Sequence, residues 1–145
     1  MKRSIRTQTT GQNSEVSGLQ PLLDIASAQP LGPGELRARR SELSTAFMQD
    51  ASGGHLSLLG QADAAFDAGY LAILAVLGPE VPIGHPHPDP LLVQSATAEL
   101  NLPGDASDEA LAFISRQYDI DYRQSVDPTA LLRWARLIRA AAGIG

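Results

Sequence analysis

The amino-acid sequence predicts an all-α protein, an up-and-down helical bundle of about five helices. No segment alternates apolar and polar residues with a period of two, and apolar residues recur at three- and four-residue steps in several segments. Alanine and leucine dominate, whereas β-branched residues are few. The 145 residues suit one domain. We expect residues 1–18, which are polar, to form a disordered tail and residues 19–145 to form that domain.

Apolar spacing predicts three helices before residue 78. A short helix over Leu19–Ala28 precedes the turn residues QPLGPG, and Pro33 then opens a helix that runs to about Gln49. The expected buried face of this second helix holds Leu36, Leu43, Ala46 and Phe47, with Arg37 and Arg40 near another face. The pattern is strongest in the third helix, Leu56–Leu77, whose helical row is Leu59, Ala62, Phe66, Ile73 and Leu77.

Proline and capping signals divide the rest of the chain. Five prolines make residues 78–90 a rigid loop, and Pro88 or Pro90 starts a short helix that Pro103-Gly104 stops. We expect residues 107–123 to form one helix with a buried stripe of Leu111, Ile114, Tyr118 and Tyr122. Asp127-Pro128 opens the last helix, Thr129–Ala142. That helix is expected to bury Leu131, Ala135, Ile138 and Ala142, together with Trp134 and Leu137, while Arg133, Arg136 and Arg139 point elsewhere.

The third helix carries apolar residues on two sides. Besides its core-facing row, Leu71 and Leu74 form a second face next to Tyr70. A helix that is apolar on two sides is buried on both. One interpretation makes Tyr70, Leu71 and Leu74 the interface of a homodimer, and the other places this helix at the centre of a single bundle.

Composition excludes several classes of function. The chain has no cysteine, which excludes disulfides, zinc thiolate sites and cysteine nucleophiles. A formal net charge of −5 is unlike the basic footprint of a protein that binds DNA over a broad surface. The first residues lack the apolar core of a secretory signal, and the longest apolar run, Leu71–Leu77, is too short to span a membrane. We therefore expect a cytoplasmic protein without membrane contact, and no residue pattern indicates a cofactor.

Polar aromatic and charged residues gather at the end of the helix predicted over residues 107–123. They are Arg116, Tyr118, Asp119, Tyr122 and Arg123. In a structural interpretation, Asp119 has the spacing to form helix-surface ion pairs with Arg116 and Arg123, and the tyrosines anchor the helix end. In a functional interpretation, this is a binding site whose carboxylates orient an arginine, so that its planar fork meets a phosphate or a partner's carboxylate.

Two further groups have metal-ligand chemistry. His85, His87 and Asp89 alternate along the proline loop and form a weak candidate metal site, although an exposed turn is the favoured interpretation. Asp63 and Asp67 are four residues apart on the third helix, a spacing that suits acid–base catalysis or a metal. The Glu-x-x-His segments of a di-metal bundle are missing, so we expect this pair to face solvent or an arginine of a neighbouring helix. No catalytic residue is predicted.

The helix order and two motifs resemble the HEPN family, named for higher eukaryote and prokaryote nucleotide-binding domains. An alanine-rich helix containing ADAAFDAGYLAILAVLG precedes a helix that ends in RQYDIDY, in which Arg116, Asp121 and Tyr122 resemble the family's R-N-x-x-D-Y segment. The resemblance covers about residues 34–142. It implies a helical bundle that forms a homodimer and binds a nucleotide, RNA or a protein partner such as a nucleotidyltransferase.

The chain departs from the family's ribonuclease pattern where catalysis depends on it. Ribonuclease members place a histidine shortly after the arginine, in the stretch where this chain has Asp121, Tyr122 and Arg123. Histidine titrates near neutral pH, whereas a tyrosine hydroxyl titrates too high to replace it easily. Gln117 also stands where the family has asparagine. The resemblance thus implies a non-catalytic member. The alternative is a metal-independent ribonuclease of a toxin–antitoxin system with a substituted acid–base residue.

Overall fold

The structure is a computed structural model that describes residues 32–78 and 88–145. In these ranges it contains helices and no strand, which confirms the predicted all-α bundle. The helices are α2 (Pro33–Ser52), α3 (Leu58–Leu77), α4 (Pro90–Glu99), α5 (Asp108–Ser115), α6 (Ile120–Ser125) and α7 (Pro128–Ala141). The predicted tail, the helix predicted over Leu19–Ala28, and His85 and His87 lie outside the described residues. No helix in the described part is long and apolar enough to cross a membrane.

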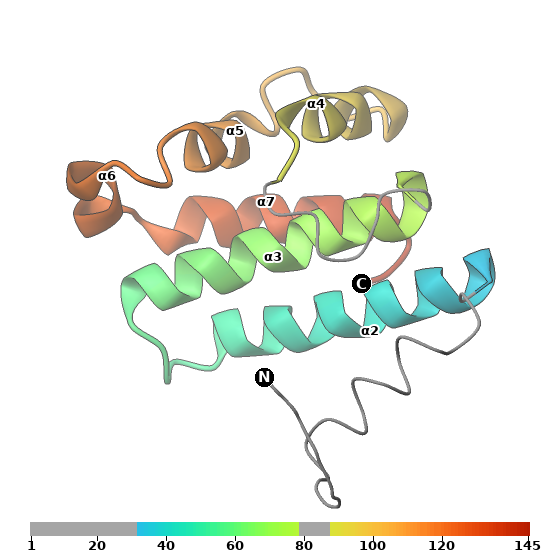
Figure 1. Cartoon of the computed structure of the whole chain (residues 1–145), viewed down its shortest axis with the longest axis horizontal. Coiled ribbons are helices and arrows are strands. Elements are labelled where there is room, and N and C mark those ends of the chain that lie inside the picture. The colour runs from blue at the N-terminus through green and yellow to red at the C-terminus, as the bar shows by residue number, and fades with distance from the viewer. Residues whose placement is uncertain (1–31, 79–87) are drawn as a thin grey trace, which may run out of the picture. The chain divides into compact units, whose positions relative to one another are not determined.

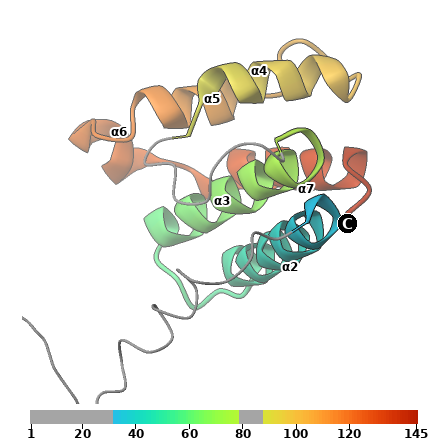
Figure 2. The same cartoon turned by 45° about the vertical axis from the view of Figure 1, so that its right-hand side comes forward.

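Helix α3 is the centre of the bundle. Helices α2 and α7 pack along it, and α4, α5 and α6 lie over α3 and α7 on the side away from α2 (Figures 1 and 2). The connection from α2 to α3 is short, and these two helices run antiparallel (Figure 1). Helices α4 to α6 carry the chain back, so α7 lies beside α3 and runs in the same direction (Figure 1).

Polar caps fix where the helices begin. Ser57 Oγ accepts a hydrogen bond of 3.0 Å from the backbone N–H of Gly60 at the start of α3. Asp89, Asp119 and Asp127 accept equivalent bonds at the starts of α4, α6 and α7. These bonds satisfy backbone N–H groups that have no partner within the first helical turn. The start predicted at Asp127-Pro128 is confirmed, and α4 begins at one of its two predicted starts.

Aromatic rings fill the core between α3, α5 and α7. The ring of Phe66 stacks on those of Phe113 and Trp134, with ring centroids 5.1 and 5.6 Å away. Trp134 also lies directly against Gly69. The small residues of α3 therefore let its neighbours approach closely. The residues predicted to be buried on α7 are confirmed at Leu131, Ala135, Ile138, Ala142 and Trp134.

The buried faces of α2 and α7 differ from the prediction at several positions. Leu43 and Leu137, expected in the core, are 48% and 40% exposed, and Ala46 is exposed as well. Arg40 and Arg139, expected on other faces, are only 5% and 8% exposed. The predicted apolar rows are therefore wrong at these positions. Helix α2 buries Arg40 instead of Leu43 and Ala46, and α7 buries Arg139 instead of Leu137.

Hydrogen bonds explain why both arginines are buried. Arg40 Nη1 donates to the carbonyl oxygens of Leu74 and Gly78, at 3.1 and 2.6 Å. These carbonyls end α3, where a helix has unpaired acceptors and attracts positive charge. Arg139 Nη1 donates to Ser44 Oγ at 2.7 Å, and that hydroxyl donates to a backbone carbonyl of α3. Polar bonds thus connect α2 to both α3 and α7.

The helix predicted over residues 107–123 is in fact two helices, and the one-helix prediction is wrong. Helix α5 ends at Ser115, and α6 begins at Ile120. Asp119 explains the break, because its backbone is extended and its Oδ1 accepts a hydrogen bond of 3.1 Å from the backbone N–H of Tyr122. An aspartate side chain competes for backbone N–H groups, so it favours a helix start over a helix interior.

Candidate functional site

The break between α5 and α6 separates the residues predicted to form one site. The structure places Arg116 with Asp119 and Tyr122, places Arg123 with Asp63, and leaves Tyr118 in solvent. The prediction that Tyr118 belongs to a buried stripe is wrong, because it lies in the connection between the two helices. We call residues 116–120 the α5–α6 turn.

Arg116 is held from two sides. Its guanidinium carbon lies over the ring of Tyr122, 4.7 Å from the centroid, and its Nη2 lies 3.4 Å from Oδ2 of Asp119. The predicted ion pair between Arg116 and Asp119 is therefore confirmed. The hydrogen bond from the Tyr122 backbone N–H, assisted by Arg116, holds the pKa of the Asp119 carboxyl below its ordinary value. Both charged groups are exposed, so this pair orients the guanidinium more than it stabilises the fold.

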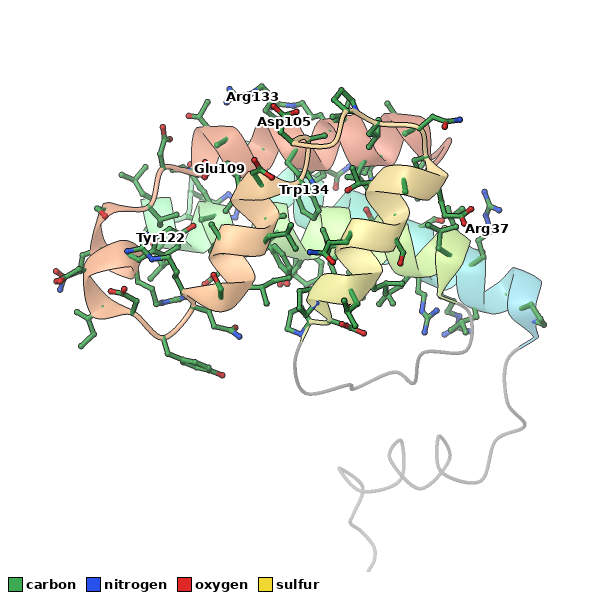
Figure 3. All side chains as sticks on the ribbon, turned by 90° about the horizontal axis from the view of Figure 1, so that it is seen from above. Arg37, Asp105, Glu109, Tyr122, Arg133 and Trp134 are labelled. Atoms are coloured by element: carbon green, nitrogen blue, oxygen red, sulfur yellow. The ribbon has the colours of Figure 1, made fainter. Side chains whose placement is uncertain are left out.

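Tyr122 connects this group to the core. Its ring meets that of Phe113 edge-on, with centroids 6.4 Å apart. Its hydroxyl oxygen is buried and has no hydrogen-bond partner among the described residues. Burial, reinforced by the negative charge of Glu109, raises the pKa of Tyr122; Figure 3 shows Glu109 on α5 and Tyr122 on α6. At neutral pH the hydroxyl keeps its proton, so Tyr122 supports Arg116 and does not act as a base.

Two large side chains project from the α5–α6 turn. Tyr118 is 79% exposed and Ile120 is 71% exposed. They flank Asp119, whose capping bond fixes the backbone between them. Tyr118 was among the predicted site residues, but Ile120 was not, because the single predicted helix gave its buried stripe to other positions and left Ile120 without a role. The aspartate directly before Ile120 is the signal that would have shown a new helix starting there.

A cavity of about 290 Å³ lies between α3, α5 and α6. It is lined by Asp63, Phe66, Asp67, Pro88, Phe113, Ile114, Gln117 and Arg123. Arg123 Nη2 lies 3.3 Å from Oδ2 of Asp63. Of the two predicted alternatives, solvent or an arginine of a neighbouring helix, Asp63 meets the arginine and Asp67 is exposed to solvent. The ion pair at Asp63 also replaces the predicted pair between Arg123 and Asp119.

Asp67 is the second carboxylate of this cavity. It forms no hydrogen bond or ion pair with any described residue. Partial burial of its carboxyl, together with the negative charge of Asp63, raises the pKa of Asp67 to about 6, although the residue as a whole is exposed. The sequence identified the two aspartates but gave no local signal for Phe113 and Gln117, which approach them only through the packing of α5 on the bundle.

The remaining candidate residues have neighbours within the chain. The Tyr70 hydroxyl accepts a hydrogen bond of 2.8 Å from the backbone N–H of Asp89, and Asp89 itself caps α4. Leu71 and Leu74 are half-buried. Among the residues that the structure describes, no group of three or more His, Cys, Asp or Glu side chains has the arrangement to hold a metal ion.

Comparisons of the chain with protein family models, with curated proteins and with solved structures found no match. The α5–α6 turn and the cavity are therefore the features of the described residues that indicate a function.

Proposed function

We propose that this chain is a non-catalytic helical interaction module whose α5–α6 turn binds a protein partner. The exposure of Tyr118 and Ile120 is the observation that carries the proposal. Large side chains exposed together on a fixed backbone are typical of surfaces that a partner covers. Tyrosine and arginine are also enriched among the residues that dominate binding energy, and Arg116 stands beside this pair, oriented by Tyr122.

The distribution of charge favours a protein partner over RNA. Binding to a phosphate backbone requires a local excess of positive charge. On the turn, Arg116 is already paired with Asp119, and Asp121 follows within the first turn of α6. A partner that covers Tyr118 and Ile120 with apolar groups and offers a carboxylate to Arg116 fits this surface better.

The HEPN resemblance supports the same class of function, and from it we also propose that the chain forms a homodimer. In this proposal a second copy packs against the face of α3 that contains Leu71 and Leu74, next to Tyr70. The proposal is limited to binding, because the sequence has no histidine where ribonuclease members carry one. Sedimentation equilibrium is expected to show a dimer that Leu74→Asp converts to a monomer. A wild-type chain that stays monomeric at the highest soluble concentration removes the dimer from the proposal.

A matched pair of double variants tests the turn. One variant combines Tyr118→Ser with Ile120→Ser, and the other combines Leu58→Ser with Leu91→Ser, two leucines of similar exposure on α3 and α4. The full chain is used to capture partners from an extract of its source cells, and each captured protein is then purified for measurement of its Kd. We expect the turn variant to weaken binding about 10-fold or more, since exposed anchors contribute above about 1.4 kcal/mol.

Three outcomes decide the proposal. Weaker binding by the turn variant, with the Leu58 and Leu91 variant unchanged and both variants equally helical by circular dichroism, supports it. Equal binding by the wild-type and turn-variant chains overturns the assignment of the site. Capture of RNA alone, or cleavage of RNA by the purified chain, overturns the class of function.

A further inference from the structure

The cavity between α3, α5 and α6 differs in chemistry from the exposed turn. Its volume of about 290 Å³ is near the lower limit for small-molecule sites, which span roughly 300–1,000 Å³. Its lining has four apolar residues, among them the buried Phe66 and Phe113, and four polar ones, which are Asp63, Asp67, Gln117 and Arg123. Small-molecule sites between the helices of a bundle likewise place polar groups beside apolar side chains.

The charges in the cavity do not balance. Asp63 is paired with Arg123 at 3.3 Å, which leaves Asp67 without a hydrogen bond or ion pair among the described residues. Asp67 is exposed, and a second carboxylate lining the same cavity disfavours its ionised form. A bound cation would restore the balance, and Gln117, which also lines the cavity, has an amide group able to accept a further hydrogen bond.

An organic cation fits this cavity better than a metal ion does. The described residues provide no group of three metal-ligating side chains. The guanidinium of Arg123, held at Asp63, repels a divalent metal ion about twice as strongly as it repels a singly charged ammonium group at the same distance. An ammonium group needs only a carboxylate and another acceptor, and its carbon body would contact the apolar surface of Phe66 and Phe113.

We propose that this cavity binds a small organic cation, a primary amine carried on an aromatic or short aliphatic body, with Asp67 as its counter-ion. The ammonium group donates hydrogen bonds to Asp67 and to the amide oxygen of Gln117. Asp63 stays paired with Arg123 and closes the neighbouring side. The site uses neither Tyr118 nor Ile120, so its test is independent of the test of the interaction module.

Calorimetric titration of the full chain with benzylamine and with benzyl alcohol, at neutral pH, tests this proposal. The two probes have the same ring and nearly the same size, and only benzylamine is charged. We expect benzylamine to bind about 10-fold more tightly than benzyl alcohol. Asp67→Asn is expected to remove this preference. Glu42→Gln, which removes an exposed carboxylate from α2, is expected to preserve it.

A second measurement locates the probe within the cavity. In two-dimensional amide NMR spectra, benzylamine is expected to shift the side-chain signals of Gln117, and Ile114→Trp, which fills the cavity, is expected to abolish the shift. Equal affinities for the two probes overturn the assignment, and so does undetectable binding of benzylamine at millimolar concentration. An Asp67→Asn variant that is folded and still prefers benzylamine also overturns it.

Discussion

The indole of Trp134 lies so close to Gly69 that a Cβ atom at position 69 would be 2.3 Å from Cζ3 of the ring. Replacing a helical glycine with alanine ordinarily stabilises a helix. At Gly69 the sign reverses, because the added methyl group pushes Trp134 away from the rings that it stacks on. We expect Gly69→Ala to lower the free energy of unfolding by about 1–3 kcal/mol, measured by urea denaturation.

Gly34 provides the control for this prediction. It lies in the first turn of α2, where an added Cβ would meet no atom within 4 Å. We expect Gly34→Ala to leave the stability unchanged or to raise it by up to about 1 kcal/mol. A Gly69→Ala chain as stable as the Gly34→Ala chain would show that the contact with the indole is not tight.

The Ser107 hydroxyl is a buried connector between three elements. It accepts a hydrogen bond of 2.9 Å from Trp134 Nε1 and lies 2.7 Å from Thr97 Oγ1. Ser107→Ala leaves the indole N–H buried without an acceptor, and we expect a loss of about 1–3 kcal/mol of stability. The exposed Ser115→Ala is expected to change stability by less than about 0.5 kcal/mol. Similar urea midpoints for the two variants would contradict this role.

The end of α3 is stabilised by an arginine from another helix. Arg40→Met keeps most of the side-chain volume but removes the donors to Leu74 and Gly78, and we expect a loss of about 2 kcal/mol. The neighbouring Arg39 is exposed, so Arg39→Met should change stability by less than about 0.5 kcal/mol. Chemical denaturation of both variants measures this difference in the free energy of unfolding. Equal values for the two variants would show that the guanidinium of Arg40 does not stabilise the fold.

Asp67 gives the stability a pH dependence of defined sign. Its pKa is about 6 in the folded chain, compared with an ordinary value of 3.8, so the folded chain holds this proton more tightly. Between about pH 4 and pH 6 the folded state binds more protons than the unfolded state, and the contribution of Asp67 to stability falls as the pH rises. Because Asp67 is exposed, solvent screens this effect, and we expect Asp67→Asn to raise Tm by only about 2–4 °C at neutral pH.

The advantage of Asp67→Asn should shrink to about zero near pH 4, where the folded wild-type carboxyl is also neutral. Thermal melts of both chains across this range, with Glu42→Gln as the control for net charge, check the prediction. An increase in Tm that is constant from pH 4 to neutral pH, or that Glu42→Gln reproduces, would contradict it.

Local signals predicted the helices better than they predicted which residues face inward. The start at Asp127-Pro128 and the buried row from Leu131 to Ala142 followed from capping and apolar spacing. The burial of Arg139 did not follow from these local signals, because the buried guanidinium is stabilised by a hydrogen bond to the hydroxyl of Ser44 on another helix. A pattern that counts apolar residues cannot anticipate a buried arginine whose partners are distant in sequence.

In the candidate site, too, contacts between residues close in sequence were predictable and contacts between distant residues were not. The pairing of Arg116 with Asp119 follows from their spacing alone. The pairing of Arg123 with Asp63 depends on how α6 meets α3, so the sequence left open whether the aspartates face solvent or an arginine of a neighbouring helix. The break at Asp119 had a local signal, the aspartate itself, but the apolar periodicity around it outweighed that signal.

Helix α6 has only six residues and no buried one, and a helix of this length does not persist by itself in water. Its helical structure depends on the Asp119 cap, on the ion pair between Arg123 and Asp63, and on the contact of Tyr122 with the ring of Phe113. Substitutions in α6, which forms one side of the cavity, are therefore expected to change the free energy of unfolding of the bundle only slightly. Lineages of this protein could acquire new ligand preferences by altering α6 while the packing of α2, α3 and α7 is retained.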